Sequence, residues 1–472
     1  MTEAAAAWPA ERGTAPYVEG NPAGRAVLAE YFAIGDRLVV FVLRPESDHP
    51  YVVELPVDRR RAAALVADSA VAPGPDGRPL GDAEEWAETA RALVEPAVRH
   101  SRPGEVLWFV GHDVLHLLPL HAAPLPGGEW LLDRNPVCYA PSATVMQQCR
   151  RKVRGDGRGA LVVGDPGGDL RNAREEAVAV GEVLGTDPLI GGRATRENVL
   201  ARLEREDPAL VHFACHGSFD AADPMSSGID LGTGGEDDRL TVRDLLTVRM
   251  RPDLVTLGAC RTGLHRLAPG DELLGLARAL LYAGARATVL SLWNVADLST
   301  RLLMGRLYAE LRTEADVAAG PPGSAGPPGA AGPPGAAVTD MAAGRARSPV
   351  EALRAAQLYL KSLTVRDVLD AMDGEQAPAA DDPERRLTAL LARAQMQAAA
   401  LDPGEAAAGY LAALDVLPAL PGPTDPSLAP RLSRRAALLR FKARLPAAPD
   451  YGRRPFAHPY HWAPFVLHGD WS

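Results

Sequence analysis

Short apolar runs alternate with longer helical segments between residues 160 and 312, and this alternation constrains the fold more than any other feature. Four runs are apolar almost throughout, at 160–164, 209–214, 253–259 and 286–292. Such strands are typical of sheets buried on both faces, because a strand with one solvent-exposed face would alternate apolar and polar residues. A helix is predicted between the last two runs, at 271–283, with Gly284 as its C-terminal cap. The pattern predicts an α/β fold with a mostly parallel sheet covered by helices on both faces.

The composition bounds the class of protein and its location. The 472 residues include 50 Lys and Arg against 60 Asp and Glu, a net charge of −10. A nucleic-acid-binding domain would need a basic surface, so nucleic-acid binding is not expected. No uncharged apolar stretch reaches about 18 residues, and the first residues lack a basic segment followed by an apolar core. We therefore expect a soluble, cytoplasmic protein that contacts neither membranes nor nucleic acid directly.

The cysteines and common motifs exclude several kinds of site. The four cysteines are Cys138, Cys149, Cys215 and Cys260, and they form no CxxC pair. Reduced thiols are expected rather than disulfides, and clustered zinc ligands are missing. The phosphate-binding GxxxxGK[ST] loop, HExxH and GxSxG are absent from the sequence as well. These patterns predict no cofactor and no metal, and they exclude simple metallopeptidases and serine hydrolases.

Two of the predicted strands end in residues that can perform nucleophilic chemistry. One run leads to His216 and Gly217, and another leads to Cys260, with Gly263 nearby. Ligands and reacting groups collect at the carboxyl ends of strands in an open parallel sheet, so the two side chains can meet there. The imidazole would assist thiolate formation and then protonate the leaving amine. The alternative is that the cysteine is a core residue and the histidine is only hydrogen-bonded.

Four longer segments resemble the CHAT domain, a branch of the caspase–separase clan of cysteine peptidases. They are VHFACHG, LVTLGACRTG, GDELLGLARALLYAGARATVLSLWNVAD and HPYHWAPFVLHGD. Shorter matches lie upstream, at 28–32, 114–120, 139–143 and 162–166. The resemblance implies a caspase-like α/β/α sandwich, with Cys260 as the nucleophile and His216 as the catalytic histidine. It also implies that the backbone N–H groups of Gly217 and Cys260 hold the oxyanion.

Two acidic residues are candidates for a substrate pocket. In separase-like relatives an acidic residue after the corresponding Leu-Trp strand helps to bind a basic residue before the scissile bond, and Asp297 is the closest match here. Asp271 is the second candidate. Each also stands at a predicted helix start, where an aspartate can act as an N-cap, and this structural role is favoured for Asp271. Cleavage after Arg or Lys is thus a hypothesis.

Several conspicuous residues near these motifs are interpreted as structural. Cys215 would point away from His216 on an extended strand and is predicted to be a core residue. His212 shares the face of His216 but should sit deeper. The aromatic residues Trp293, Tyr460 and Trp462 are predicted to be core rather than a binding platform.

The chain is predicted to contain seven segments. They are a loose segment at 1–25, the N-terminal part of the CHAT domain at 26–150 with a strand pair at 37–43 and 51–55, a catalytic core at 151–315, a Gly/Pro-rich linker at 316–348, a CHAT helix at 349–370, an Ala/Pro-rich helical insertion at 371–454 and a closing segment at 455–472. Six G-X-Y triplets occur at 320–337. Collagen needs three chains and many more triplets, so a linker is expected.

The leading functional hypothesis is a caspase-like cysteine endopeptidase that cleaves a protein or peptide substrate. Many CHAT proteins carry TPR repeats that recruit a partner, and none is recognisable here. Regulation is therefore expected to come from a separate protein, TPR-like for example, or through the 371–454 insertion and the Gly/Pro-rich linker. Two alternatives remain open. One is a catalytically silent CHAT-fold scaffold or binding module, and the other is a cysteine-dependent acyltransferase or other hydrolase that uses the same two residues.

Overall fold

The structure is a computed structural model, which describes most of the chain. The described residues are 26–68, 83–152, 159–168, 170–218, 223–232, 238–258, 271–293, 297–312, 347–374, 382–420, 426–444 and 448–470. The segments 1–25 and 320–337, predicted to be loose and to form a linker, lie outside them.

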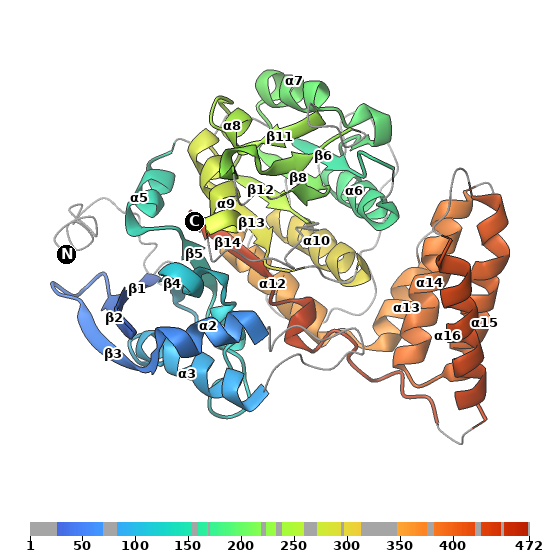
Figure 1. Ribbon diagram of the computed structural model, residues 1–472, viewed down its shortest axis with the longest axis horizontal. Coiled ribbons are helices and arrows are strands. Elements are labelled where there is room, and N and C mark those ends of the chain that lie inside the picture. The colour runs from blue at the N-terminus through green and yellow to red at the C-terminus, as the bar shows by residue number, and fades with distance from the viewer. Residues whose placement is uncertain are drawn as a thin grey trace.

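Eleven of the strands in the described ranges form one sheet in the order β3-β2-β1-β4-β5-β14-β13-β12-β8-β6-β7 (Figure 1). Their bounds are β1 Ala26–Ile34, β2 Arg37–Leu43, β3 Tyr51–Asp58, β4 Val106–Val110, β5 Val137–Ala140, β6 Ala160–Gly164, β7 Leu189–Ile190, β8 Leu210–Ala214, β12 Leu254–Leu257, β13 Ala287–Ser291 and β14 Phe465–Gly469. A second, small sheet contains β9 Gly217–Ser218, β10 Gly228–Asp230 and β11 Arg239–Thr241.

The large sheet consists of two parallel blocks that run in opposite directions. In the first block β1, β4, β5 and β14 are parallel, with β2 and β3 added as antiparallel edge strands. In the second block β13, β12, β8, β6 and β7 are parallel. The blocks meet where β13 pairs antiparallel with β14. The carboxyl ends of the two blocks therefore lie at opposite edges of the sheet.

Helices cover both faces of the sheet. Their bounds are α2 Arg59–Asp68, α3 Ala83–Arg99, α4 Leu131–Arg134, α5 Ala143–Arg151, α6 Arg171–Leu184, α7 Arg196–Glu206, α8 Val242–Leu245, α9 Asp271–Ala283, α10 Asp297–Leu311, α12 Pro349–Ser362, α13 Val365–Gly374, α14 Pro383–Ala399, α15 Pro403–Val416 and α16 Leu428–Lys442. Leu161 and Val163 of β6 pack in a core with α7, α8 and α9, whereas Val162 packs in another with α6, α10 and α12. This division confirms the predicted α/β/α sandwich and its mostly parallel sheet.

The first strand was not among the strands predicted from the sequence. Residues 28–32, which the sequence marks only as part of a motif, belong to β1. This strand lies inside the sheet, between β2 and β4. Its side chains include three alanines and Glu30, residue types that are depleted in strands, so the local pattern did not indicate one.

The closing segment returns to the middle of the sheet. β14 separates β5 from β13, and Gln357 of α12 donates hydrogen bonds to the backbone oxygens of Trp462 (2.9 Å) and Phe465 (3.0 Å). At the end of the strand, the guanidinium group of Arg286 pairs with Asp470, which is only 1% exposed on its side chain. β14 is thus the strand through which the two blocks join.

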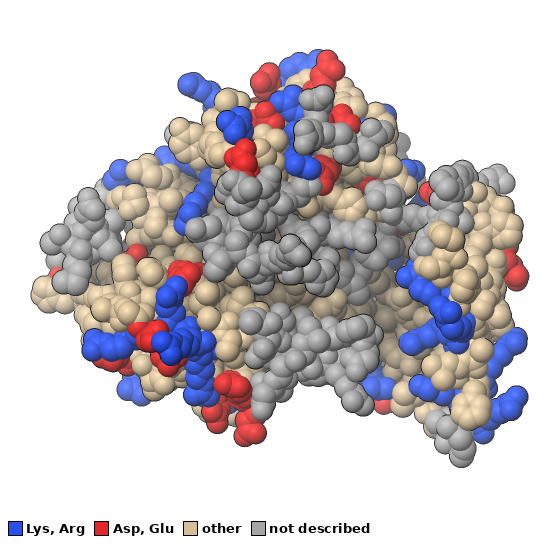
Figure 2. All heavy atoms as spheres, viewed as in Figure 1, with Lys and Arg blue, Asp and Glu red and all other residues tan. Residues whose placement is uncertain are grey.

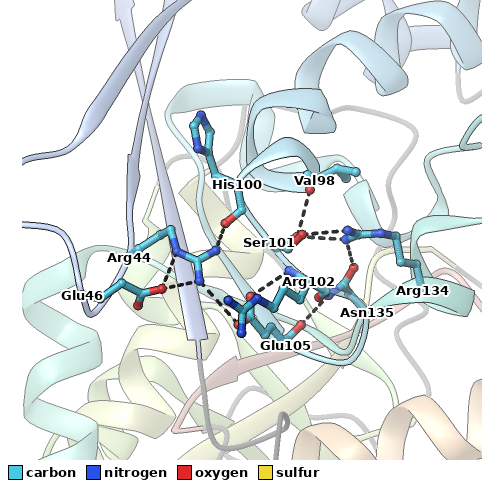
Figure 3. A network of polar contacts seen from close by, with 9 residues as sticks. All are labelled: Arg44, Glu46, Val98, His100, Ser101, Arg102, Glu105, Arg134 and Asn135. Carbon is cyan, nitrogen blue, oxygen red and sulfur yellow. Dashed lines mark hydrogen bonds and ion pairs between the residues drawn. The ribbon is translucent and has the colours of Figure 1, made fainter.

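A polar network surrounds the amino end of β4 (Figure 3). Glu105 accepts a hydrogen bond from the backbone N–H of Arg102 at 2.8 Å, and the Arg44 guanidinium lies 3.5 Å from its other oxygen. Asn135 donates to the backbone oxygens of Arg102 (2.8 Å) and Glu105 (2.6 Å). Because Glu105 is buried, the Arg102 N–H and the Arg44 guanidinium offset part of the cost of taking its charge out of water.

The predicted helical character of the C-terminal insertion is confirmed. Helices α14, α15 and α16 share a core of their own, and α14 also packs against α6 and α13. Figure 1 shows these three helices at the right, beside the sheet and its covering helices. We call α14–α16 the helical unit.

Candidate active site

The ends of β8 and β12 lie side by side at the carboxyl edge of the second block. The strands are parallel neighbours, and Phe213 pairs with Leu257 in their register. The backbone N–H of Gly258 donates to the Phe213 oxygen at 2.8 Å, which extends the pairing one residue beyond β12. The chain beyond β8 contains His216, and the chain beyond β12 contains Cys260.

His216 stands between the large sheet and the small one. It follows β8 and directly precedes β9, whose Gly217 pairs with Ile229 of β10. The backbone oxygen of His216 accepts a hydrogen bond from the Asp230 N–H at 2.8 Å. The backbone of His216 is therefore held by both sheets, while its side chain is half-buried and within reach of solvent.

The other predicted site residues are described only in part. Cys260 lies outside the described residues, two positions beyond Gly258 in the chain. Asp271 and Asp297 are the first residues of α9 and α10, as predicted, but their side chains also lie outside what the structure describes. Gly217 is described and half-buried at the start of β9. The structure thus brings together the two strand ends, and of the five predicted residues it describes His216 and Gly217 in full.

A buried polar cluster lies beneath these strand ends. His212 of β8 is 0% exposed, and its Nε2 lies 3.1 Å from Oε1 of Glu176 on α6, outside hydrogen-bond alignment. Its Nδ1 lies 3.2 Å from the hydroxyl of Tyr308 on α10, a hydrogen-bonding distance. The side chains of Glu176 (4% exposed) and Tyr308 (0%) are buried too.

Gly258 allows this cluster to approach β12. A Cβ atom on Gly258 would lie 2.2 Å from Glu176 Oε1 and 3.4 Å from His212 Cε1. The Glu176 carboxylate therefore packs directly against the backbone just beyond β12, and only glycine leaves room for it. The cluster therefore packs against the backbone that leads from β12 toward Cys260.

Asp165 holds the end of the neighbouring strand β6. Its side chain is buried, and its carboxylate accepts hydrogen bonds from the Leu170 N–H (2.7 Å) and from Arg174 Nε (2.9 Å). Its own N–H donates to the Ala214 oxygen at 3.0 Å. Its φ of 47° is in the left-handed region, which an aspartate adopts more readily than most residues. Asp165 thereby joins the ends of β6 and β8.

Glu176, Tyr308 and Asp165 were not predicted from the sequence. One signal existed for Glu176, because it occupies a position on the apolar stripe of α6 that contains Ala173, Ala177 and Val180. A carboxylate at such a position is buried and needs a partner. No comparable signal existed for Tyr308, since a tyrosine on a helix is most often a core residue.

The residues predicted to be structural are buried or engaged by neighbours. Cys215 is 3% exposed, and burial raises the pKa of its thiol well above the usual value. Since the thiolate is the reactive form, Cys215 is a poor nucleophile and the core prediction is confirmed. Trp462 is 0% exposed, and Trp293 Nε1 donates to the Tyr460 oxygen at 3.1 Å. These contacts favour packing over a binding platform.

Neither a metal site nor a membrane span is found in the described part of the chain. No group of three or more His, Cys, Asp or Glu side chains in the described ranges is arranged to hold a metal ion. Among the same residues, no helix combines the length and apolar character needed to cross a bilayer.

Comparison with known proteins identifies the family. The model of the CHAT domain matches residues 86–320. Tetratricopeptide repeat protein 28 from Mus musculus is 27% identical over 231 residues, which cover 39% of this chain and 9% of that protein. The Homo sapiens protein of the same name is 27% identical over 225 residues, covering 38% and 8%. The chain thus spans less than a tenth of these curated relatives.

Two solved structures are also similar. Both are of the Saccharomyces cerevisiae separase–securin complex, and both are 10% identical to this chain. One covers 70% of this chain and 29% of its own, with a TM-score of 0.42. The other covers 61% and 27%, with a TM-score of 0.38. The family model, and not this distant likeness, shows that the chain contains a CHAT domain at residues 86–320.

Proposed function

We propose that the chain is a caspase-like cysteine endopeptidase in which His216 and Cys260 act together on a protein substrate. The observation that supports this most is the parallel pairing of β8 with β12, extended by the hydrogen bond from Gly258 to Phe213. His216 follows Phe213 by three residues, and Cys260 follows Gly258 by two. The segments that lead to His216 and to Cys260 thus leave one edge of the sheet from adjacent strands, where reacting groups of open α/β folds gather.

The proposed reaction needs only these two side chains and the backbone. The imidazole of His216 takes the proton of the Cys260 thiol, and the thiolate attacks the carbonyl carbon of the scissile peptide. The backbone N–H groups of Gly217 and Cys260 would stabilise the oxyanion that forms. The imidazolium then donates its proton to the leaving amine, and water hydrolyses the thioester to free the enzyme.

The exposure of the candidate groups supports this assignment of roles. The His216 side chain is half-buried, so a proton acceptor there remains accessible to a substrate. The neighbouring Cys215 is buried in the core, with its Sγ 3.7 Å from the Val163 oxygen. Of the two cysteines near this edge in the sequence, Cys260 is therefore the proposed nucleophile.

The substrate pocket is proposed to include Asp297, with Asp271 as the second acidic candidate. Asp297 begins α10, directly after β13, which is the next strand beside β12. A carboxylate at that position would favour a basic residue before the scissile bond. We also propose a cytoplasmic location and a separate regulatory partner protein, because many CHAT proteins carry their regulatory repeats on the same chain and none is recognisable here.

The alternative is a catalytically silent scaffold that uses the CHAT fold for binding. The helical unit favours it, because α14–α16 form a core of their own outside the sheet. A binding module of this kind would need no reactive thiol.

The deciding experiment combines peptide cleavage with thiol labelling. A fluorogenic peptide panel and an acyloxymethyl ketone probe would be applied to the wild type, Cys260→Ala and the matched control Cys215→Ala, alone and with cell extract. We expect turnover to fall at least about a thousandfold in Cys260→Ala, with loss of labelling, and both to persist in Cys215→Ala. A preference for Arg or Lys before the cleaved bond would support the acidic pocket. A wild type that is silent and unlabelled in every condition would favour the scaffold.

A further inference from the structure

Helix α16 ends a row of helices and is buried along one stripe only. α15 packs against α14 on one side and α16 on the other. The buried residues of α16 are Leu432, Ala436 and Leu439, which are spaced by four and three positions and so share one face. Almost all its other residues are exposed.

The free side of α16 has apolar side chains that a terminal helix would normally lack. Phe441 is 63% exposed and Leu438 is 47% exposed. The last helix of a stacked array keeps a polar outer face when nothing packs on it. Exposed large apolar residues in such a place indicate a contact surface, provided that they belong to a patch rather than standing alone.

Phe441 belongs to such a patch, because it lines a groove between α15 and α16. The groove is lined by Leu411 of α15 and by Ala436, Ala437, Phe441, Arg440 and Arg444 from α16 and the turn after it, together with Ser433. The lining combines an apolar wall with two guanidinium groups. Aromatic and arginine side chains in apolar pockets are the residues that contribute most to binding energy at protein interfaces.

The charge of this surface is opposite to that of the chain as a whole. Residues 428–444 contain six basic residues and no acidic one, although the net charge of the protein is −10. Within the described part of the chain, no ion pair engages Arg434, Arg435, Arg440, Lys442 or Arg444. Figure 2 shows Lys and Arg side chains gathered over the helical unit at the right. The surface therefore attracts a negatively charged partner.

We propose that the α15–α16 groove binds an acidic, amphipathic helix of a partner protein. A helix lying along this groove would place its apolar side chains beside Phe441 and Leu411. Its carboxylates would accept paired hydrogen bonds from Arg440 and Arg444. This role is independent of any reaction at His216.

RNA and anionic membranes would also be attracted by positive charge. Two features favour a protein helix over them. The groove places Phe441 against Leu411 and alanine side chains, which fits an aliphatic side chain between two helices, and the unit is itself built by stacking one helix on the next. Both other partners are therefore outcomes of the test.

The test measures fluorescence anisotropy of labelled peptides with the full chain. The probe is a helical peptide of about 15 residues with Leu and Phe on one face and Glu on the others, and its counterpart has Lys in place of Glu. The variants are Phe441→Ala and Arg440→Glu combined with Arg444→Glu. Arg249→Glu, at an exposed position of the sheet domain, is the matched charge control. Because the altered residues are exposed, circular dichroism should show unchanged folding.

We expect saturable binding of the acidic peptide that weakens between about 50 and about 300 mM salt. Each groove variant should weaken it about tenfold or more, and Arg249→Glu should not. The proposal is overturned if no binding occurs below about 1 mM, if the Lys peptide binds equally, or if the variants have no effect. It is also overturned if a short single-stranded RNA or phosphatidylserine vesicles bind more tightly through the same residues. A concentration-dependent dimer lost in Phe441→Ala would assign the groove to a second copy instead.

Discussion

The two blocks of the sheet are built alike but keep their buried polar groups at different ends of their strands. In the first block the network around Glu105 lies at the amino end of β4 (Figure 3). In the second block Glu176 and His212 adjoin Gly258, at the carboxyl end of β12. Each arrangement removes a carboxylate from water, which is costly unless partners compensate for it.

Because the two blocks run in opposite directions, both clusters lie at one edge of the sheet, which holds the amino ends of the strands in the first block and the carboxyl ends in the second. In the first block, hydrogen bonds from Arg102 and Asn135 close the turn before β4, at the amino end of the strand, where open α/β sheets rarely bind ligands. In the second block, the buried cluster holds the backbone that continues toward Cys260, beside the strand that leads to His216. Buried charge thus holds the chain in both blocks, but only in the second does it do so at the carboxyl ends of the strands, where chemistry is expected.

The largest expected effect tests whether the blocks form one cooperative unit through β14. Asp470→Ala would leave the buried Arg286 guanidinium with only Asp253, 3.2 Å away, as a charged partner. We expect the free energy of unfolding to fall by about 3–5 kcal/mol, because an unpaired buried charge is costly. Urea denaturation followed by tryptophan fluorescence and circular dichroism measures this.

The control is Arg251→Ala, which breaks an exposed ion pair with Asp207 and should cost less than about 1 kcal/mol. Two separate unfolding steps, of which Asp470→Ala shifts one, would show that β14 does not couple the blocks.

The second prediction concerns the loss of folding stability at acidic pH. Burial lowers the pKa of His121, beside β5, and of His468, in β14, to about 3 each. As pH falls below about 6.5, the unfolded chain binds a proton at each position and the folded protein does not. Stability is therefore fully present above pH 6.5 and falls by about 1.4 kcal/mol per pH unit for each histidine, down to about pH 3.

The measurement is urea denaturation at about pH 7 and about pH 4.5, where each histidine should account for about 2–3 kcal/mol. His121→Gln and His468→Gln should each reduce the loss, whereas the exposed His49→Gln should leave it unchanged. Equal acid sensitivity in all four proteins would contradict the role assigned to these two buried imidazoles.

The smallest expected effects compare glycines at the strand ends. Gly258→Ala should lower the free energy of unfolding by about 1–3 kcal/mol, because its Cβ would lie 2.2 Å from Glu176 Oε1. Gly111→Ala, after β4 in the first block, would place Cβ 2.9 Å from the His116 backbone nitrogen and should cost a similar amount. Gly305→Ala in α10 meets no atom within 4 Å and should stabilise by about 0.5–1 kcal/mol.

Thermal and urea unfolding of these three variants would show whether the side chains and backbone are packed equally closely at the strand ends of both blocks. A stable Gly258→Ala would mean that Glu176 does not pack against the backbone beyond β12.

Much of the second block could be predicted because its signals are local. Apolar runs such as 160–164 and 253–259 indicate strands buried on both faces, and β6 and β12 lie within them. The predicted parallel sheet also implied that the strands leading to His216 and Cys260 end at one edge, and the parallel pairing of β8 with β12 confirms this. The identity of the reacting groups remains a proposal.

The sequence by itself determined the α/β class, the buried strands of the second block and the helical insertion. The signals for these features, periodicity and apolar content, can be read from a few neighbouring residues. Only the tertiary structure decided that β14 separates the two blocks, since its partners β5 and β13 lie far away in the chain. It likewise decided that Glu176 and Tyr308 meet at His212. Such contacts depend on how three elements pack together, and no local pattern specifies that packing.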